Sequence, residues 1–239
     1  MSTAAGVSTA AGVSTAAGIG ARRLAHRGDW RHAPENTLEA MLMALRAPAC
    51  DGLEFDVRVS KDSVPVLSHD ATLRRVQGLP GRVDGMTAEE LRRYGISTLA
   101  AVLEAIPRSA SLDVEVKVDP GLRFVPLLER HRGVGDTLAN AIVSSFDTRL
   151  LERVGRERPG WVRWLNAESL GEDVLGRARD LGCACVSVEW HAIDERAVER
   201  ARSAGLAVAA WTVRRRSTFH RLARLGVMAV CVEAAALDG

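Results

Sequence analysis

One short segment of this 239-residue chain spaces two carboxylates in a way that suits metal binding. Residues 53–57 read Leu-Glu-Phe-Asp-Val. Because side chains of a β-strand point alternately to its two faces, Glu54 and Asp56 would share one face and the apolar residues the other. A buried strand of this kind would direct both carboxylates into one site.

A second segment repeats this pattern and adds a cation. Residues 112–117 read Leu-Asp-Val-Glu-Val-Lys, so Asp113, Glu115 and Lys117 would share a face. Unpaired buried charges are costly, so a cluster of interior carboxylates needs cations. Lys117 and a divalent metal would supply them, and hard oxygen ligands favour Mg²⁺ or Ca²⁺ over zinc. The alternative is an ion-pair network between strands, and we expect the deeper Asp113 to pair with an arginine or lysine.

Two histidines stand at the ends of predicted strands. His26 ends the predicted strand 23–26 and precedes Arg27, and His69 follows the predicted strand 64–68. Imidazoles exchange protons near neutral pH, and arginine makes planar contacts to phosphate. Together with a divalent metal and a lysine, these groups suit attack on a phosphate ester.

The elements that must position these residues alternate between short apolar segments and amphipathic ones, which predicts parallel strands connected by helices. Eight such units predict an α/β fold, a single (β/α)8 TIM barrel with its active site at the carboxyl ends of the strands. An open doubly wound sheet is the alternative, although no glycine-rich phosphate loop follows any predicted strand. The predicted strands span residues 23–26, 53–57, 64–68, 112–117, 141–144, 162–165, 184–188 and 207–212.

Helical periodicity and end signals place the connecting helices. Thr87 and Glu90 have the spacing of a capping box, which predicts the start of a helix. Gly182, Gly205 and Gly226 stand where amphipathic segments should end. The other predicted helices span residues 37–46, 122–131, 148–157, 172–181, 194–204 and 217–225.

Composition and charge exclude several classes of protein. The chain has 32 Lys and Arg, 30 Asp and Glu and a net charge of +2, so it carries no bulk basic field for nucleic acid. No apolar run reaches the ~18 residues of a membrane helix, so we expect no stable membrane insertion. The four cysteines are too sparse for a disulfide framework, and we expect reduced thiols.

The first 20 residues differ in character from the rest. They contain three copies of a Ser-Thr-Ala-Ala-Gly repeat and no charged side chain. This composition predicts a low-complexity, disordered tail rather than a secretory signal, which needs a basic start and a strongly apolar core. We therefore expect a cytoplasmic protein with one barrel domain over residues 21–239.

The motifs resemble, in chain order, those of the glycerophosphodiester phosphodiesterase family. Two departures bear on substrate choice more than on the chemistry. The family usually has asparagine where this chain has Arg214, and it commonly has Thr-Asp-x-Pro where this chain runs through residues 230–234. The matching motifs are His26-Arg27-Gly28, Pro34-Glu35-Asn36-Thr37, Glu54-x-Asp56, residues 64–70, Thr98-Leu99, Glu115-x-Lys117, Ser145-Phe146-Asp147 and Trp211-Thr212-Val213.

The resemblance implies an enzyme that hydrolyses small glycerophosphodiesters, such as glycerophosphocholine or glycerophosphoethanolamine. The products would be sn-glycerol 3-phosphate and an alcohol, and the cofactor would be one divalent metal ion, Mg²⁺ or Ca²⁺. The oligomeric state stays open. The implied residues are Glu54, Asp56 and Glu115 for the metal, His26 and His69 for acid/base catalysis, Arg27 and Lys117 for phosphate, and Phe146 and Trp211 for the walls of the glycerol pocket.

Two other functions remain open at this point. The same site could hydrolyse lysophospholipids in a phospholipase D-like reaction, which needs an apolar path that the sequence does not identify. The barrel could also bind a phosphorylated ligand without turnover. All implied metal ligands and both histidines are present, which favours a glycerophosphodiester phosphodiesterase.

Overall fold

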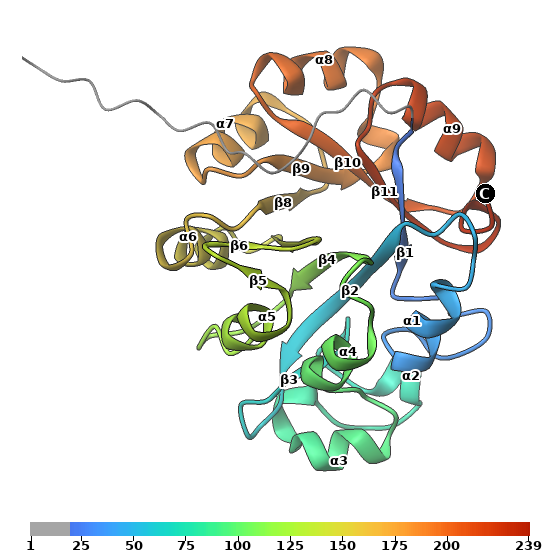
Figure 1. Ribbon diagram of the computed structural model, residues 1–239, viewed down its shortest axis with the longest axis vertical. Helices are drawn as coiled ribbons and strands as arrows, with labels where there is room; N and C mark the ends of the chain where they lie inside the picture. The colour runs from blue at the N-terminus through green and yellow to red at the C-terminus, as the bar shows by residue number, and fades with distance from the viewer. Residues whose placement is uncertain (1–19) are drawn as a thin grey trace, which may run out of the picture.

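Eight parallel strands close into a barrel in the computed structural model, which describes residues 20–239 (Figure 1). The barrel closes because β1 pairs with both β11 and β2. The predicted (β/α)8 barrel is confirmed, whereas most of the predicted N-terminal tail, residues 1–19, lies outside the described residues. The barrel strands, in chain order, are β1 (Arg22–His26), β2 (Gly52–Val59), β4 (Ser111–Val116), β7 (Ala141–Ser145), β8 (Arg163–Ala167), β9 (Cys185–Glu189), β10 (Ala207–Val213) and β11 (Ala229–Val232).

Helices surround the barrel, and side-chain caps begin several of them (Figure 1). Thr37 accepts a hydrogen bond from Ala40 N at 3.2 Å, and Thr87 with Glu90 forms the predicted capping box. The helices are α1 (Leu38–Ala44), α2 (Arg74–Gln77), α3 (Ala88–Arg93), α4 (Leu99–Ala105), α5 (Val125–Arg132), α6 (Thr148–Glu157), α7 (Glu172–Asp180), α8 (Glu195–Ser203) and α9 (Arg216–Arg224). Shorter elements are the 3₁₀ turns η1 (Val83–Gly85), η2 (Trp190–Ala192) and η3 (Ala234–Ala236), and the hairpin of β5 (Gly133–Val134) and β6 (Thr137–Leu138).

The prediction of a barrel strand at 64–68 is wrong. This segment forms β3 (Pro65–Leu67), which pairs antiparallel with β2 in the register Val57 to Leu67. The reason is the length of the connection. A parallel neighbour requires a crossover of about a dozen residues or more, whereas β2 and β3 are separated only by residues 60–64. The hairpin therefore extends β2 beyond the barrel.

The eighth barrel strand is instead β11, which no predicted strand covers. Its four residues are all buried, and Ala229 lies opposite Arg22 of β1 and Ala209 of β10. The segment is only four residues long and entirely apolar, so it has no alternation of apolar and polar residues to indicate a strand. The sequence predicts the right number of barrel strands but assigns one of them to the wrong segment.

The two faces of the barrel strands bury different side chains. Leu53, Phe55 and Val57 belong to the large apolar core that includes helix residues, as the alternation predicts. The interior contains a smaller apolar cluster made of Leu24, Trp164, Cys185, Ala209, Ala229 and Cys231. This cluster forms the floor beneath the polar side chains that end the strands.

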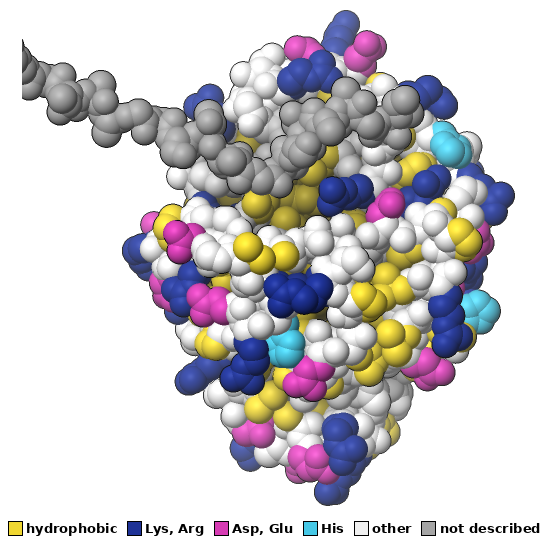
Figure 2. All heavy atoms as spheres, in the orientation of Figure 1, with side chains coloured by type: hydrophobic (Ala, Val, Ile, Leu, Met, Phe, Trp, Pro, Cys, Tyr) yellow, Lys and Arg dark blue, Asp and Glu magenta, His cyan; other side chains and the backbone are white. Residues whose placement is uncertain are grey.

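The outer surface carries charges of both signs. Figure 2 shows basic and acidic side chains interspersed on the face that it presents, in keeping with the net charge of +2. Within residues 20–239, no helix has the length and apolar character needed to cross a bilayer. The cytoplasmic location stays a prediction.

Candidate active site

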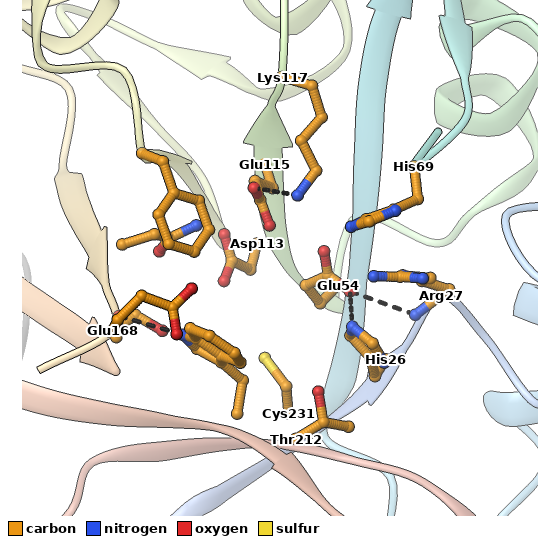
Figure 3. A pocket seen from close by; sticks show the side chains of 14 residues that line it. His26, Arg27, Glu54, His69, Asp113, Glu115, Lys117, Glu168, Thr212 and Cys231 are labelled. Atoms are coloured by element: carbon orange, nitrogen blue, oxygen red, sulfur yellow. Dashed lines mark hydrogen bonds and ion pairs between the residues drawn. The ribbon is translucent and has the colours of Figure 1, made fainter. Parts of the chain in front are cut away.

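A pocket of about 380 Å³ opens at the carboxyl ends of the barrel strands (Figure 3). Most residues implicated by the sequence meet here, although Asp56 lies behind the pocket surface. Its lining comprises His26, Arg27, Glu54, His69, Asp113, Glu115, Lys117, Phe146, Asn166, Glu168, Ser187, Trp211, Thr212 and Cys231.

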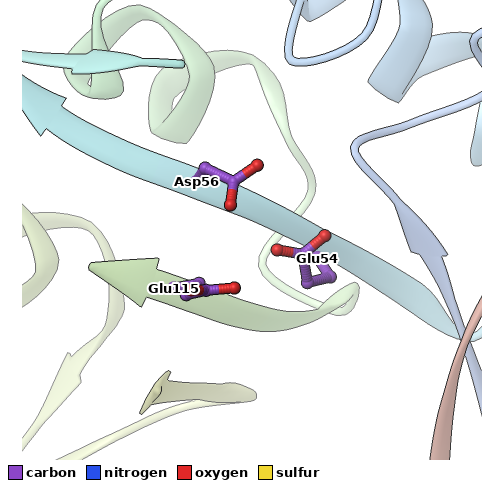
Figure 4. Close-up of side chains that lie close together, drawn as sticks. All are labelled: Glu54, Asp56 and Glu115. Carbon is purple, nitrogen blue, oxygen red and sulfur yellow. The ribbon is translucent and has the colours of Figure 1, made fainter. Parts of the chain in front are cut away.

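The three carboxylates of the predicted metal site converge. Glu54, Asp56 and Glu115 offer oxygens that lie within 4.8 Å of one another (Figure 4). The parallel register of β2 and β4 explains this, because Asp56 lies directly opposite Glu115. Burial, and the neighbouring Asp56 carboxylate, raise the pKa values of both Glu54 and Glu115. The cluster therefore needs a cation to hold all three groups ionised.

The surroundings of one oxygen in this cluster favour a metal ion. Glu54 Oε1 is buried and accepts no hydrogen bond from any residue in the described chain, 20–239. Its partner, Glu54 Oε2, accepts one from Arg27 N at 3.2 Å. A buried acceptor without a donor is destabilising unless a cation meets it. Three carboxylates are suitable ligands for a hard divalent ion, so the cluster could hold one.

Two cationic side chains flank the innermost carboxylate. Arg27 Nε lies 3.0 Å from Asp56 Oδ2, and Lys117 Nζ lies 3.1 Å from Asp56 Oδ1. Lys117 also pairs with Glu115. Although burial alone would raise it, Arg27 and Lys117 hold the pKa of Asp56 at about 2. Asp56 is therefore ionised at any physiological pH.

The loop after β1 has an unusual backbone that aims Arg27 into the site. Arg27 has a φ of 59°, in the left-handed region that non-glycine residues rarely adopt. Its N–H donates to Glu54 O at 2.8 Å. At Gly28, with a φ of 84°, an added Cβ would lie 2.6 Å from the backbone of Ala40, so only glycine fits. The His-Arg-Gly sequence thus fits the requirements of this turn.

Asn36 holds the metal-site strand rather than capping a helix. Asn36 and Thr37 both precede α1 and are residue types that often cap helices, but only Thr37 is the N-cap of α1. Asn36 Nδ2 donates to Asp56 Oδ2 at 2.8 Å, and Asn36 Oδ1 accepts from Asp56 N at 3.1 Å. This paired contact fixes both the main chain and the side chain of Asp56.

His26 is oriented by a carboxylate from the other end of the chain. Its Nδ1 lies 2.6 Å from Glu233 Oε1, and its Nε2 lies 3.8 Å from Glu54 Oε2. Glu233 Oε2 accepts from Arg214 Nε at 2.7 Å. Against the effect of burial, His26 and Arg214 lower the pKa of Glu233 to about 2. An ionised carboxylate only accepts, so Nδ1 carries a proton and Nε2 faces the carboxylate cluster.

His69 reaches the same pocket from the β2–β3 hairpin. Its Nδ1 lies 2.7 Å from Asp70 Oδ1, and its carbonyl accepts from Arg58 Nε at 2.9 Å. Burial lowers the pKa of His69 below its usual value. The sequence predicts this position correctly, but the supporting element is a hairpin and not a barrel strand.

An ion-pair chain joins the surroundings of His69 to Arg27. Asp70 accepts from Arg75 Nε at 2.7 Å, and Arg75 makes two further bonds of 2.7 Å to Glu35. Glu35 Oε1 also accepts from Arg27 NH1 at 2.9 Å. The loop after β1 and the loop after β3 are therefore locked together at the mouth.

Phe146 and Trp211 form an aromatic face of the pocket. Their ring centroids lie 5.8 Å apart with an interplanar angle of 70°. Trp211 Nε1 donates to Ser187 O at 3.1 Å, which fixes the indole, and Lys117 Nζ lies 5.5 Å from the Phe146 centroid. The aromatic face thus begins next to the cationic groups.

Asp113 does not make the ion pair that the sequence predicts. Its Oδ1 instead accepts from Ser144 Oγ at 2.5 Å, and no salt bridge reaches it within residues 20–239. Burial raises the pKa of Asp113 to about 7. Asp113 lies two residues before Glu115 on β4, and Ser144 of β7, which stands opposite Glu115, reaches it with its hydroxyl.

Several side chains at or beside the pocket have no assignment from sequence, among them Arg75, Asn166, Glu168 and Glu233. Asn166 and Glu168 continue the alternation of β8, so a longer strand prediction could have found them. The sequence analysis includes Glu233 only as part of residues 230–234, where this chain departs from the Thr-Asp-x-Pro pattern. Arg75 carries no local signal at all.

Comparisons with known proteins agree with this geometry. Residues 26–237 match the family model described as the glycerophosphoryl diester phosphodiesterase family. A glycerophosphodiester phosphodiesterase from Caldanaerobacter subterraneus subsp. tengcongensis is 28% identical over 227 residues, covering 85% of this chain and 90% of that protein.

Solved structures are similar over most of the chain. An Oleispira antarctica phosphodiesterase in complex with the product sn-glycerol-3-phosphate has a TM-score of 0.78 and 27% identity, covering 88% of this chain and 92% of its own. A glycerophosphodiester phosphodiesterase from Thermotoga maritima has a TM-score of 0.77 and 28% identity, covering 91% and 96%. The chain therefore belongs to the glycerophosphoryl diester phosphodiesterase family, and it is an enzyme of that class, a phosphoric diester hydrolase.

Proposed function

We propose that this enzyme hydrolyses glycerophosphodiesters, such as glycerophosphocholine and glycerophosphoethanolamine, to sn-glycerol 3-phosphate and an alcohol. One observation carries the proposal. The carboxylates of Glu54, Asp56 and Glu115 offer oxygens within 4.8 Å of one another, and Glu54 and Glu115 line a pocket that two oriented histidines also line. The product bound by the Oleispira antarctica phosphodiesterase supports the same substrate class.

The three carboxylates would hold one divalent ion, Mg²⁺ or Ca²⁺. Such an ion supplies Lewis-acid stabilisation of the charge that develops on phosphoryl oxygens. Arg27 and Lys117 bind the same phosphate, and their pairing with Asp56 holds both cations in place before substrate enters. A preorganised cationic site of this kind stabilises the transition state more than the ground state.

The two histidines form the acid/base pair. Glu233 and Asp70 bind their Nδ1 atoms, which leaves each Nε2 to exchange a proton with the attacking or leaving oxygen. Burial lowers the pKa of His69, which favours the neutral imidazole of a general base. The acid that protonates the leaving alcohol is then His26.

Phe146 and Trp211 enclose the glycerol end of the substrate. Their edge-to-face contact leaves an apolar surface beside Lys117, where the carbon atoms next to the phosphate would pack. Excluding water at this surface strengthens the contacts of the phosphate with Arg27 and Lys117.

The test is hydrolysis by the metal-stripped protein with Mg²⁺ or Ca²⁺ restored. Glycerophosphocholine, glycerophosphoethanolamine and glycerophosphoglycerol are supplied separately, and sn-glycerol 3-phosphate is measured. We expect metal-dependent product in the wild type, its loss in Glu54→Gln, and wild-type turnover in Glu104→Gln, a change at an exposed site on α4. Metal-independent turnover, or no product from any of the three, would contradict the proposal.

A further inference from the structure

The side of the pocket across the barrel from β1 has a buried acceptor that receives no hydrogen bond from residues 20–239. Asn166 of β8 is only 6% exposed and lines the pocket. Its Oδ1 accepts no hydrogen bond from the described chain, and its Nδ2 has one long contact of 3.5 Å to Ser144 Oγ. β8 lies four strands from β1 in either direction around the barrel. A buried carbonyl oxygen without a donor is destabilising, so a ligand hydroxyl would find a ready partner here.

A second free acceptor stands directly above the first. Glu168 is the next inward position after Asn166, and it is exposed and lines the same pocket. No hydrogen bond or salt bridge to its carboxylate is formed by residues 20–239, whereas Glu54 and Glu115 of this pocket both have partners. Figure 3 shows the Glu168 carboxylate directed into the pocket, on the side opposite His69 and Arg27.

The two acceptors share the pocket with two aromatic side chains, and Ser187 of β9 lies opposite Asn166. Phe146 and Trp211 present carbon surface, and Trp211 Nε1 already donates to Ser187 O. Free acceptors beside an aromatic surface fit a ligand that combines hydroxyl donors with CH groups. A quaternary ammonium carries no N–H and could not satisfy Asn166 Oδ1. An acyl chain would leave the buried Asn166 Oδ1 without a donor.

Depth decides which end of the substrate lies here. Asn166 is one inward position above Trp164 of the apolar floor, so it stands at the closed end of the pocket. The glycerol end is common to all glycerophosphodiesters, and a closed end suits a group of fixed size. The alcohol varies in size and suits the open mouth.

We propose that Asn166 and Glu168 form a hydroxyl-binding subsite that recognises the free hydroxyl groups at the glycerol end of the substrate. This inference rests on the proposed function and narrows it. The subsite makes the enzyme select deacylated glycerophosphodiesters over lysophospholipids, because a site built to bind a hydroxyl rejects an analogue that lacks it.

Three substrates that all release choline test the selection. They are glycerophosphocholine, its 1-O-methyl ether and lysophosphatidylcholine. We expect kcat/KM of the wild type to fall at least ~10²-fold from the first to the other two. In Glu168→Ala, kcat/KM for glycerophosphocholine should fall to within about fivefold of kcat/KM for the ether. Glu168→Gln keeps an acceptor and should recover part of this loss. Asp173→Ala, an exposed carboxylate on α7, should match the wild type.

A binding measurement separates this inference from the proposed function. Calorimetry with sn-glycerol 3-phosphate and propyl phosphate should give at least about tenfold weaker binding of propyl phosphate to the wild type, and nearly equal binding of the two to Glu168→Ala and Asn166→Leu. Equal binding of both ligands by the wild type overturns the subsite, as does an equal loss of all substrates in Glu168→Ala. If no substrate releases choline while the binding preference holds, the proposed function fails and the subsite stands.

Discussion

The two sides of the pocket differ in how completely their polar groups are paired. On the side of β1, β2 and β4, cations and carboxylates form one connected network around Asp56, which lies within 3.1 Å of both Arg27 and Lys117, although Glu54 Oε1 accepts no hydrogen bond from residues 20–239. On the side of β7, β8 and β10, two aromatic rings stand near Asn166 Oδ1, which accepts no hydrogen bond from residues 20–239, and near the exposed carboxylate of Glu168. We call these the charged wall, which is Arg27, Glu54, Asp56, Glu115 and Lys117, and the aromatic wall, which is Phe146, Asn166, Glu168 and Trp211.

The difference indicates separate tasks. The charged wall is organised before substrate arrives, as required of groups that stabilise developing charge. The aromatic wall leaves its acceptors to be satisfied by the substrate, as required of groups that discriminate between substrates. Changes in the charged wall or its supports should therefore lower the turnover of every substrate alike, whereas changes in the aromatic wall should alter the ratio between substrates.

Outside the metal ligands, the largest loss is expected for His69→Ala. Removing a general base typically lowers the rate by about 10²–10⁴-fold. The loss should be the same for glycerophosphocholine and glycerophosphoethanolamine, because His69 stands beside the charged wall. Steady-state kinetics with both substrates measures it, and His131→Ala, on α5, serves as the control. A loss confined to one substrate would contradict the separate tasks of the two walls.

Glu233→Ala should give the next largest effect. It removes the acceptor that orients His26 from a distance of 2.6 Å, and losing such an outer partner typically costs about 10–100-fold. The loss should appear in kcat with little change in KM, because Glu233 does not line the pocket. Glu233→Gln keeps an acceptor for Nδ1 and should recover most of the activity. Identical kinetics of the Ala and Gln variants would show that orientation of His26 is not the cause.

The success of the sequence predictions follows the same division. Glu54, Asp56, Glu115 and Lys117 could be predicted because strand alternation sets their faces, and parallel pairing brings neighbouring strands into register. Glu233 could not, because it meets His26 across 207 positions of sequence, and no local pattern encodes such a contact.

The fold shows the same limit. Alternating strands and helices predict the barrel, but not that residues 65–67 turn back on β2 while the four residues of β11 close the ring. These outcomes depend on connection length and on pairing between the two ends of the chain. The lack of a donor for Asn166 Oδ1 among residues 20–239 likewise depends on which residues surround it in the fold, which the sequence alone does not reveal.

Arg75→Ala should have a smaller effect, of several-fold in kcat/KM. Arg75 is 47% exposed and links Asp70 to Glu35 without touching the pocket, and exposed ion pairs contribute about 1 kcal/mol or less. Its neighbour Arg74 on α2 is exposed and forms no ion pair with residues 20–239, so Arg74→Ala provides the matched control. A loss as large as that of Glu233→Ala would mean that the ion-pair chain, rather than the charged wall alone, organises the site.

The smallest expected effect is a pH-dependent change in stability at Glu233. Its folded-state pKa is about 2, below the ordinary value of 4.5. The unfolded state therefore binds the proton first as pH falls, so the stabilisation is present above about pH 4.5 and is lost toward pH 2. Between pH 6 and 2.5, the Tm of the wild type should fall more than that of Glu233→Gln. Parallel curves for the two proteins would contradict the assignment of this group as ionised and paired.

A pair of titrations tests the central claim most directly. Calorimetry measures the binding of Mg²⁺ or Ca²⁺ to the metal-stripped protein, and an activity assay measures how glycerophosphocholine hydrolysis depends on the same ion. The account predicts one ion per chain, a Kd that matches the midpoint of activation, and loss of both in Glu54→Gln but not in Glu104→Gln. One ion bound by Glu54→Gln with unchanged affinity would contradict the assignment of the carboxylate cluster as the site on which hydrolysis depends.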